Sequence, residues 1–341
     1  MKVAVVMGGR SPEAGVSRAS GKNAMAALQQ AGYDVVTFEA EPGLATHLRE
    51  ANVQAVFLAT HGPLGEDGTL QGMLEFMELP YTGSGVLASA LAMHKSMAKS
   101  IFKLEGIPTA PWVTWTEADM DGDVVERLRR RGLEVPVVVK PCEGGSTIGM
   151  SIVREPAGLP SACQTALRYG HEILVEAFVP GMEITVGVLG NDQLQALPVI
   201  EIVPQGGFYN FDTKYRTGGS EHILPARLHA DILRRAGELA VRAHRALGCF
   251  GMSRVDMIVT RPVAPTGRPE EAEQSELFVL EANTLPGMTD TSLYPEACAK
   301  SGLPFHDVVR MQIEWACQRQ QRSRRGGHEE PLPGAAVQVG R

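Results

Sequence analysis

The chain has 341 residues, of which 44% are hydrophobic and 21% are charged, a composition typical of a soluble globular protein long enough for two or three domains. Its formal net charge of −7 argues against binding nucleic acid by overall electrostatic attraction, and no apolar run reaches the roughly 20 residues of a membrane span. The five cysteines form no Cys-x-x-Cys pair and the N-terminus lacks a signal peptide, so we expect reduced thiols in a cytoplasmic protein.

An open α/β domain is expected over residues 1–93. Short apolar strands are predicted at Lys2–Met7, Asp34–Phe38 and Gln54–Leu58, and a helix is predicted at Val16–Ala31. Strands that alternate with helices are typical of a parallel sheet with crossover helices. The carboxyl ends of the strands should therefore form the ligand-binding edge of this sheet.

Two loops, residues 8–13 and 61–68, follow strands at that edge. The glycine pair in the first loop lacks the G-x-G-x-x-G spacing of a dinucleotide-binding site, which disfavours an oxidoreductase. Glu13 is placed to bind an ammonium group, although many loop glutamates are only solvated. His61 can donate a hydrogen bond to a carboxylate or simply pack at the strand end.

A smaller α/β unit is expected over residues 94–180, with a long helix at Val86–Glu105. Its strands are predicted at Pro136–Lys140, Met150–Val153 and Ile173–Glu176, and a glycine-rich loop (CEGGSTIG) joins the first two. Backbone N–H groups of such a loop can approach phosphate oxygens closely, and the lysine at the strand end adds a positive charge. The spacing is not that of a Walker A loop, and a plain hairpin with an exposed lysine explains the same residues.

The strand that ends at Glu176 suggests a place for adenine. Its backbone can pair with the edge of a base while apolar side chains lie above and below the ring, and Glu183 can accept hydrogen bonds from a ribose. The alternative is a strand that ends at an exposed glutamate.

Residues 181–319 are expected to form a third unit, followed by a disordered tail at 320–341. The pattern predicts a hairpin whose strands are Glu183–Leu189 and Leu194–Ile202. It also predicts two helices, at Leu228–Leu247 and at Pro304–Gln318. Residues 205–222 form a glycine-rich, aromatic loop, and a loop of this length inside a domain is usually functional. We expect it to act as a lid that excludes water from a reactive intermediate.

Acidic and amide side chains end two apolar strands near the C-terminus. In MSRVDMIV, Arg254 and Asp256 share a face, and in LFVLEAN, Glu281 and Asn283 share a face. If the strands are neighbours, three oxygen-bearing side chains converge into the hard-ligand set that Mg²⁺ prefers. The arginine beside them favours a metal–nucleotide reaction centre. The alternative is that both strands end in acidic residues that face water.

Taken together, these segments resemble the D-alanine–D-alanine ligases of the ATP-grasp superfamily. The resemblance runs in the family's order across residues 1–318, through MGGRSPEAGVS, ATHGPLGEDGTLQGMLEFMELPYTGSGVLASALAMHK, VVVKPCEGGSTIGMS, ILVEAFVPGMEITVGVLG, FYNFDTKY, GCFGMSRVDMIV and VLEANTLPGMTDTSLYP. It implies a three-domain α/β ATP-grasp architecture with an N-terminal open parallel-sheet domain, and ATP held between the central and C-terminal domains. It also implies a homodimer that contacts through the N-terminal domain.

The resemblance implies a role for each matching residue. ATP would be bound by Lys95, Lys140, Glu176, Phe178, Val179, Glu183 and Lys214, and magnesium by Asp256, Glu281 and Asn283. The catalytic residues would be Glu13, Ser146, Tyr215, Arg254 and Gly287, and further substrate contacts would be His61, Ser292 and Leu293. In this scheme Glu13 holds the ammonium of the first amino acid, while Arg254 and the Gly287 N–H bind the reacting carboxylate oxygen.

The implied reaction joins two D-alanines for peptidoglycan precursor synthesis, using ATP and two Mg²⁺ ions, or Mn²⁺ in their place. The first carboxylate attacks the γ-phosphorus of ATP to form an acyl phosphate, and the amine of the second D-alanine then displaces phosphate. Four positions, Ala14, Gly15, His94 and Gly144, depart from the family's usual residues. They leave open a ligase for another amino acid or hydroxy acid, such as D-serine or D-lactate, and the sequence does not identify the base that takes the amine's proton.

Overall fold

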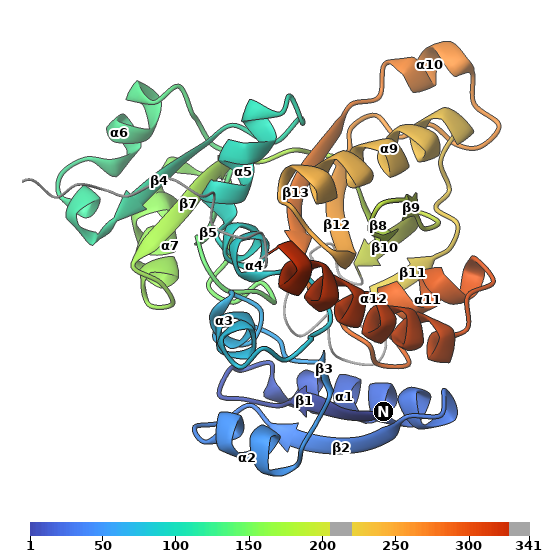
Figure 1. Ribbon diagram of the computed structural model, residues 1–341. Helices are drawn as coiled ribbons and strands as arrows, with labels where there is room; N and C mark the ends of the chain where they lie inside the picture. Colours follow the sequence, from blue (N-terminus) through green and yellow to red (C-terminus); the bar gives the residue numbers. More distant parts are fainter. Residues whose placement is uncertain (205–219, 327–341) are drawn as a thin grey trace, which may run out of the picture.

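The computed structural model describes residues 1–204 and 220–326, and the strands it describes form three sheets (Figure 1). Of the lid loop predicted at 205–222, residues 205–219 lie outside the described residues, and so do Lys214 and Tyr215, whereas residues 220–222 belong to a strand and not to a loop. Within the described residues, no helix combines the length and hydrophobicity of a membrane span.

The N-terminal residues form a three-stranded parallel sheet in the order β2-β1-β3, drawn in blue in Figure 1. Its strands are β1 (Lys2–Met7), β2 (Asp34–Glu39) and β3 (Ala55–Leu58), and its helices are α1 (Ala14–Gln30), α2 (Leu44–Glu50) and α3 (Thr69–Phe76). Side chains of β1 alternate between the two faces, so Ala4 and Val6 enter one core while Val3 and Val5 enter another. The expected parallel sheet with crossover helices is confirmed.

The central sheet is antiparallel, in the order β4-β7-β5-β6. Its elements are β4 (Trp112–Thr116), β5 (Val137–Pro141), β6 (Ser151–Val153), β7 (Glu172–Ala177), the helices α6 (Val124–Arg130) and α7 (Leu159–Leu167), and the 3₁₀ helices η1 (Glu117–Met120) and η2 (Pro156–Gly158). Val139 and Val175 pack into the core that these helices cover. Because strand residues alternate between faces, the adjacent Lys140 and Glu176 turn to the opposite face.

The third sheet is antiparallel in the order β11-β10-β8-β12-β13, with β9 also paired to β8. Its elements are β8 (Met182–Gly190), β9 (Leu194–Ala196), β10 (Ile200–Pro204), β11 (Ser220–Ile223), β12 (Gly251–Val259), β13 (Leu277–Asn283), and the helices α9 (Ala230–Ala246), α10 (Pro269–Glu273) and α11 (Leu293–Lys300). Helix α9, predicted at Leu228–Leu247, buries Ile232, Ala236 and Ala243 at helical spacing against β8 and β12. Helix α9 thus covers one face of β12 and β13, and the predicted metal ligands lie on the opposite face.

Two predicted elements are interrupted. The helix expected at Val86–Glu105 is two helices, α4 (Val86–Met93) and α5 (Lys95–Leu104), because His94 between them is extended (φ −89°, ψ 96°). The N–H of Lys95 donates to the carbonyl of Cys142 (2.8 Å), so the break ties α5 to the glycine-rich loop. The second strand of the predicted hairpin is likewise divided, into β9 and β10, around Pro198, which lacks an N–H for the ladder.

The last helix, α12 (Phe305–Gly326), runs past the predicted end at Gln318. The tail expected to be disordered from residue 320 is therefore helical to Gly326, and residues 327–341 lie outside the described residues. Helix α12 packs on α1, β3 and β12, burying Val309 and Ile313. In Figure 1 it lies between the N-terminal unit and the third sheet, and so connects them.

Candidate active site

Two adjoining cavities collect the predicted site residues. The first cavity, of about 550 Å³, lies among the N-terminal loops and the residues that follow β13. The second cavity, of about 460 Å³, lies between the central sheet and the third sheet. Lys95, Arg254 and Glu281 line both cavities. Each predicted site residue that the structure describes lines at least one of them.

Two lysines and a glutamate form a buried cluster, of which Lys140 and Glu176 line the second cavity. Glu176 accepts a hydrogen bond from Lys99 (2.7 Å) and is paired with Lys140 (2.6 Å). Its side chain is 3% exposed, so the alternative of an exposed glutamate at the strand end is wrong. Burial raises the pKa of Glu176, but the charges of Lys140 and Lys99 outweigh it and bring the pKa down to about 2.

Lys99 is not among the predicted residues, because a lysine on a helix normally faces water. The sequence feature that could have identified Lys99 is its spacing of four residues from Lys95, since residues i and i+4 lie on one face of a helix. Lys95 is buried and donates to the carbonyl of Gly144 (2.5 Å). Burial lowers the pKa values of both Lys95 and Lys99, so α5 carries two desolvated ammonium groups, of which Lys95 lines the second cavity and Lys99 contacts Glu176.

The chain after β7 forms the rim of the second cavity, where Phe178, Val179 and Glu183 line it. The N–H of Phe178 donates to the carbonyl of Pro136 (3.0 Å). Because this N–H is already used, the edge of an adenine would pair with other backbone groups of the segment. Ile202 of β10 is paired with Glu183 of β8 and also lines this cavity, where it provides an apolar surface for a flat ring.

The predicted convergence of strands β12 and β13 is confirmed. They are antiparallel neighbours, with Asp256 opposite Glu281 and Arg254 opposite Asn283. Asp256 accepts two hydrogen bonds from Arg254 (2.9 and 2.8 Å) and one from Thr185 (2.5 Å). Two carboxylates and an amide oxygen on adjoining positions of these strands form a donor set that fits a hard divalent cation such as Mg²⁺.

Glu13 and Ser146 join the N-terminal loop to the glycine-rich loop across the first cavity. Both side chains are buried, and the Ser146 hydroxyl donates to the Glu13 carboxylate. Ser146 and Thr147 adopt left-handed backbone conformations (φ 54° and 59°), which few non-glycine residues adopt and which often occur at functional sites. The arrangement places a carboxylate at the wall of the first cavity, which both residues line.

Glu66 is a second buried carboxylate of the first cavity, and it is absent from the predicted site. One of its oxygens accepts from the Gly62 N–H (3.0 Å), and the other has no hydrogen-bond partner among the described residues. Burial, followed by the charge of Glu13, raises the pKa of Glu66 to about 8. The only signal in the sequence is its place in the loop 61–68, at the carboxyl edge of the parallel sheet.

The segment after β13 closes the first cavity. The Ser292 hydroxyl lies 2.7 Å from that of Thr289 and accepts from the Thr289 N–H (3.0 Å), at the start of α11. A Cβ added at Gly287 would lie 2.9 Å from the Ser292 hydroxyl oxygen, so glycine leaves the space that Ser292 occupies. Nε2 of His61 lies 3.3 Å from the hydroxyl oxygen of Ser20. Leu293, the first residue of α11, lines both cavities.

Comparison with known proteins gives the family. The model described as "D-ala D-ala ligase C-terminus" matches residues 101–314, and the model described as "D-ala D-ala ligase N-terminus" matches residues 38–84. A D-alanine–D-alanine ligase from Geotalea uraniireducens is 46% identical over 308 residues, which are 90% of this chain and 93% of that protein. The chain belongs to the D-alanine–D-alanine ligase family. A ligase from Desulforamulus reducens is 42% identical over 94% of this chain and 99% of its own length.

Solved structures of D-alanine–D-alanine ligases are similar over nearly the whole chain. The ligase from Bacillus anthracis complexed with ATP has a TM-score of 0.78 at 30% identity and covers 95% of this chain and 99% of its own. The ligase from Coxiella burnetii has a TM-score of 0.78 at 28% identity, covering 95% and 96%. The fold is therefore the ATP-grasp fold of this family, as the resemblance implies.

Proposed function

We propose that this chain uses ATP to join two molecules of D-alanine into D-alanyl-D-alanine for peptidoglycan precursor synthesis. Membership of the D-alanine–D-alanine ligase family supports the reaction, and the relative crystallised with ATP supports the nucleotide. The observation that carries the residue roles is the meeting of the two cavities at Lys95, Arg254 and Glu281. A nucleotide in one cavity and amino acids in the other would meet at these charges.

ATP is assigned to the second cavity. Its base would lie along Phe178 and Val179, with Glu183 toward the ribose, because these residues line the rim beside apolar Ile202. Lys214, outside the described residues, is assigned to the terminal phosphate by resemblance alone.

The phosphates are assigned to Lys95 and Lys140. Both ammonium groups are already positioned by acceptors, Lys140 by Glu176 and Lys95 by the Gly144 carbonyl. Charge positioned in advance stabilises a transferring phosphoryl group without reorganisation during the reaction. Glu176 therefore acts in this proposal by positioning lysines.

Mg²⁺ is assigned to Asp256, Glu281 and Asn283, whose oxygens suit a hard cation. When bound, two Mg²⁺ ions, or Mn²⁺ in their place, would neutralise charge on the phosphates. Arg254 positions the Asp256 carboxylate by donating two hydrogen bonds to it. The same arginine lines the first cavity, so it connects the metal ligands with the amino acid site.

The first D-alanine is assigned to the first cavity, with its ammonium at Glu13 and with His61 close by. The hydrogen bond from Ser146 orients the Glu13 carboxylate, and the resemblance adds Tyr215 to this group. The carboxylate of the bound D-alanine attacks the γ-phosphorus of ATP, so that ADP leaves and an acyl phosphate forms.

The second D-alanine is assigned to Ser292 and Leu293. Its neutral amine attacks the acyl carbon, and phosphate leaves as the peptide bond forms. Arg254 and the Gly287 N–H would bind the carbonyl oxygen as it becomes negative, and losing one such donor typically costs about 10²–10³ in rate. Ser146 and Tyr215, named by resemblance near this amine, are candidates to carry its proton away.

Domain organisation, assembly and location complete the proposal. We assign three domains, residues 1–93, 94–180 and 181–319, and each is built around one of the three sheets. A homodimer through the N-terminal domain is supported by Phe76 and Leu87, which are 93% and 72% exposed on the neighbouring helices α3 and α4. Five free cysteines support a cytoplasmic location, where thiols stay reduced.

The test is a coupled ADP-release assay with ATP, Mg²⁺ and D-alanine, repeated with D-serine, D-lactate and L-alanine. We expect the highest kcat/KM with D-alanine alone, and preference for a mixed pair would indicate a ligase of another substrate. Arg254→Ala should lower kcat by about 10²–10³, and Glu13→Gln should raise the KM of the first D-alanine. The matched control is Arg130→Ala, which removes an exposed arginine of α6. Full activity in both site variants would falsify the assignment.

A further inference from the structure

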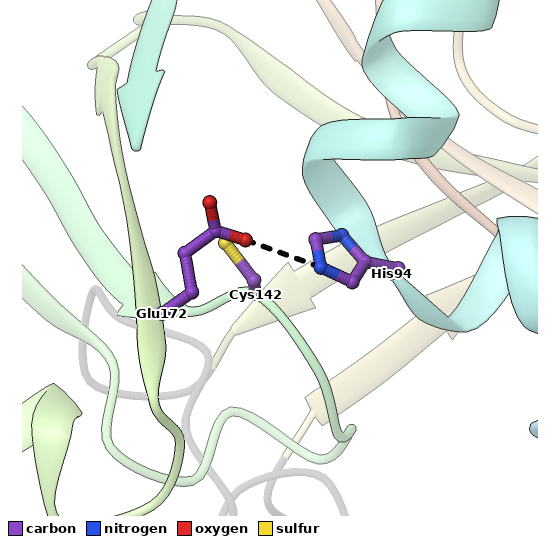
Figure 2. Close-up of side chains that lie close together, drawn as sticks. All are labelled: His94, Cys142 and Glu172. Atoms are coloured by element: carbon purple, nitrogen blue, oxygen red, sulfur yellow. Dashed lines mark ion pairs between the residues drawn. The ribbon is translucent and has the colours of Figure 1, made fainter. Parts of the chain in front are cut away.

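Three side chains that the proposed reaction does not use meet beside the second cavity. Figure 2 shows His94, Cys142 and Glu172 pointing toward one another from the α4–α5 break, the end of β5 and the start of β7. Their ligand atoms all lie within 4.8 Å of one another. His94 Nε2 lies 3.1 Å from the Glu172 carboxylate, Cys142 is buried, and the Glu172 side chain is 34% exposed.

The backbone holds these three residues together. Lys95, directly after His94, donates its N–H to the Cys142 carbonyl (2.8 Å), and Cys142 donates its N–H to the Glu172 carbonyl (3.0 Å). The Ser96 hydroxyl lies 3.3 Å from His94 Nδ1, which leaves Nε2 for the cluster. Metal-binding histidines are typically oriented in this way, by a hydrogen bond to the ring nitrogen that does not face the metal.

We propose that His94, Cys142 and Glu172 bind a divalent cation of the zinc class, with water as a further ligand. An imidazole nitrogen, a thiolate and a carboxylate oxygen are the three donor types of protein zinc sites. The sulfur selects against Mg²⁺ and Ca²⁺, which take oxygen ligands. The exposed side of Glu172 gives water access to the fourth, open position of a tetrahedral ion.

The position of the site predicts its effect. The ion would connect α5, which carries Lys95 and Lys99, with the glycine-rich loop that begins after β5 and with the strand that carries Glu176. Binding to the folded state alone raises stability in proportion to the logarithm of metal concentration over Kd. Zn²⁺ should therefore raise the melting temperature of the protein in the absence of ATP and D-alanine.

The decisive experiment uses Co²⁺ as a spectroscopic substitute for Zn²⁺. Titrating the purified full chain with Co²⁺ should produce a thiolate-to-cobalt charge-transfer band, which the proposed magnesium site cannot produce because its ligands are all oxygens. Cys142→Ala should abolish the band. The matched control is Cys317→Ala, which removes another free cysteine, on α12, and should keep it.

Two further variants keep the test decisive if Cys142→Ala folds poorly. His94→Ala removes a partly exposed ligand and should lose the Zn²⁺-dependent rise in melting temperature. Ser96→Ala should weaken Co²⁺ binding by about 10–100-fold, the usual effect of removing a group that orients a ligand. Absence of the band in the unmodified protein, or its persistence in both Cys142→Ala and His94→Ala, would overturn the proposal.

Discussion

Replacing Glu176 by glutamine tests the buried lysine cluster directly. Glu176→Gln keeps the shape of the side chain but leaves Lys99 and Lys140, with side chains 0% and 9% exposed, without the anion that both contact. Removing one partner of a buried ion pair typically costs about 3–5 kcal/mol. We expect a loss of that size in the free energy of unfolding, since two ammonium groups then repel each other in a poorly solvated place.

A second substitution should recover part of that loss. Adding Lys99→Met to Glu176→Gln removes one of the two repelling charges, so the double variant should be more stable than Glu176→Gln alone. Residues in direct contact typically show coupling energies of about 0.5–3 kcal/mol. Lys99→Met alone should cost less than Glu176→Gln, because it leaves the neutral pair of Lys140 and Glu176.

The assay is urea unfolding followed by far-UV circular dichroism at neutral pH. The control, Glu126→Gln, breaks the exposed pair with Arg130 on α6 and should change stability by no more than about 0.5 kcal/mol. Because the pKa of Glu176 is lowered from 4.5 to about 2, its contribution is present above pH 4.5 and lost as the pH falls toward 2. A Glu176→Gln variant as stable as the control, or a double variant less stable than Glu176→Gln alone, would contradict a role of Glu176 in neutralising the two lysines.

Three other substitutions have defined outcomes. Because the pKa of Glu66 is raised to about 8, its ionisation should lower the stability of the protein as the pH rises from 5 to 9. The melting temperature of Glu66→Gln should therefore match that of the unmodified protein at pH 5 and exceed it at pH 9. Equal melting temperatures of the two proteins at both pH values would contradict this expectation. Gly287→Ala should displace Ser292 and lower kcat/KM for the second D-alanine by up to about 10²-fold, with the KM of ATP unchanged in initial-rate kinetics. Phe76→Asp should convert a dimer to a monomer in analytical ultracentrifugation, and an unchanged mass would exclude that contact.

The strand ends that carry the metal ligands could be predicted because their signal is local. Arg254 and Asp256, like Glu281 and Asn283, follow the two-residue period of a strand, and an antiparallel pairing of the two strands brings them together. The pairing of the two strands could also be expected, because consecutive strands are often neighbours in a sheet.

The buried charges could not be predicted in the same way. Glu176 is buried on the face of its sheet where Lys99 of α5 and Lys140 of β5 contact it, and these contacts join positions that are distant in sequence. Lys99 reaches Glu176 across 77 positions, so its helix pattern alone suggests a solvated lysine. The break at His94 has the same origin, because the group that binds the next amide is the carbonyl of Cys142.

The most direct measurement is the anomalous scattering of Mn²⁺ in crystals grown with a non-hydrolysable ATP analogue. We expect manganese peaks within coordination distance of the Asp256, Glu281 and Asn283 oxygens, between the nucleotide phosphates and Arg254. Nucleotide bound without manganese at these side chains, or manganese held elsewhere in the cavities, would contradict it.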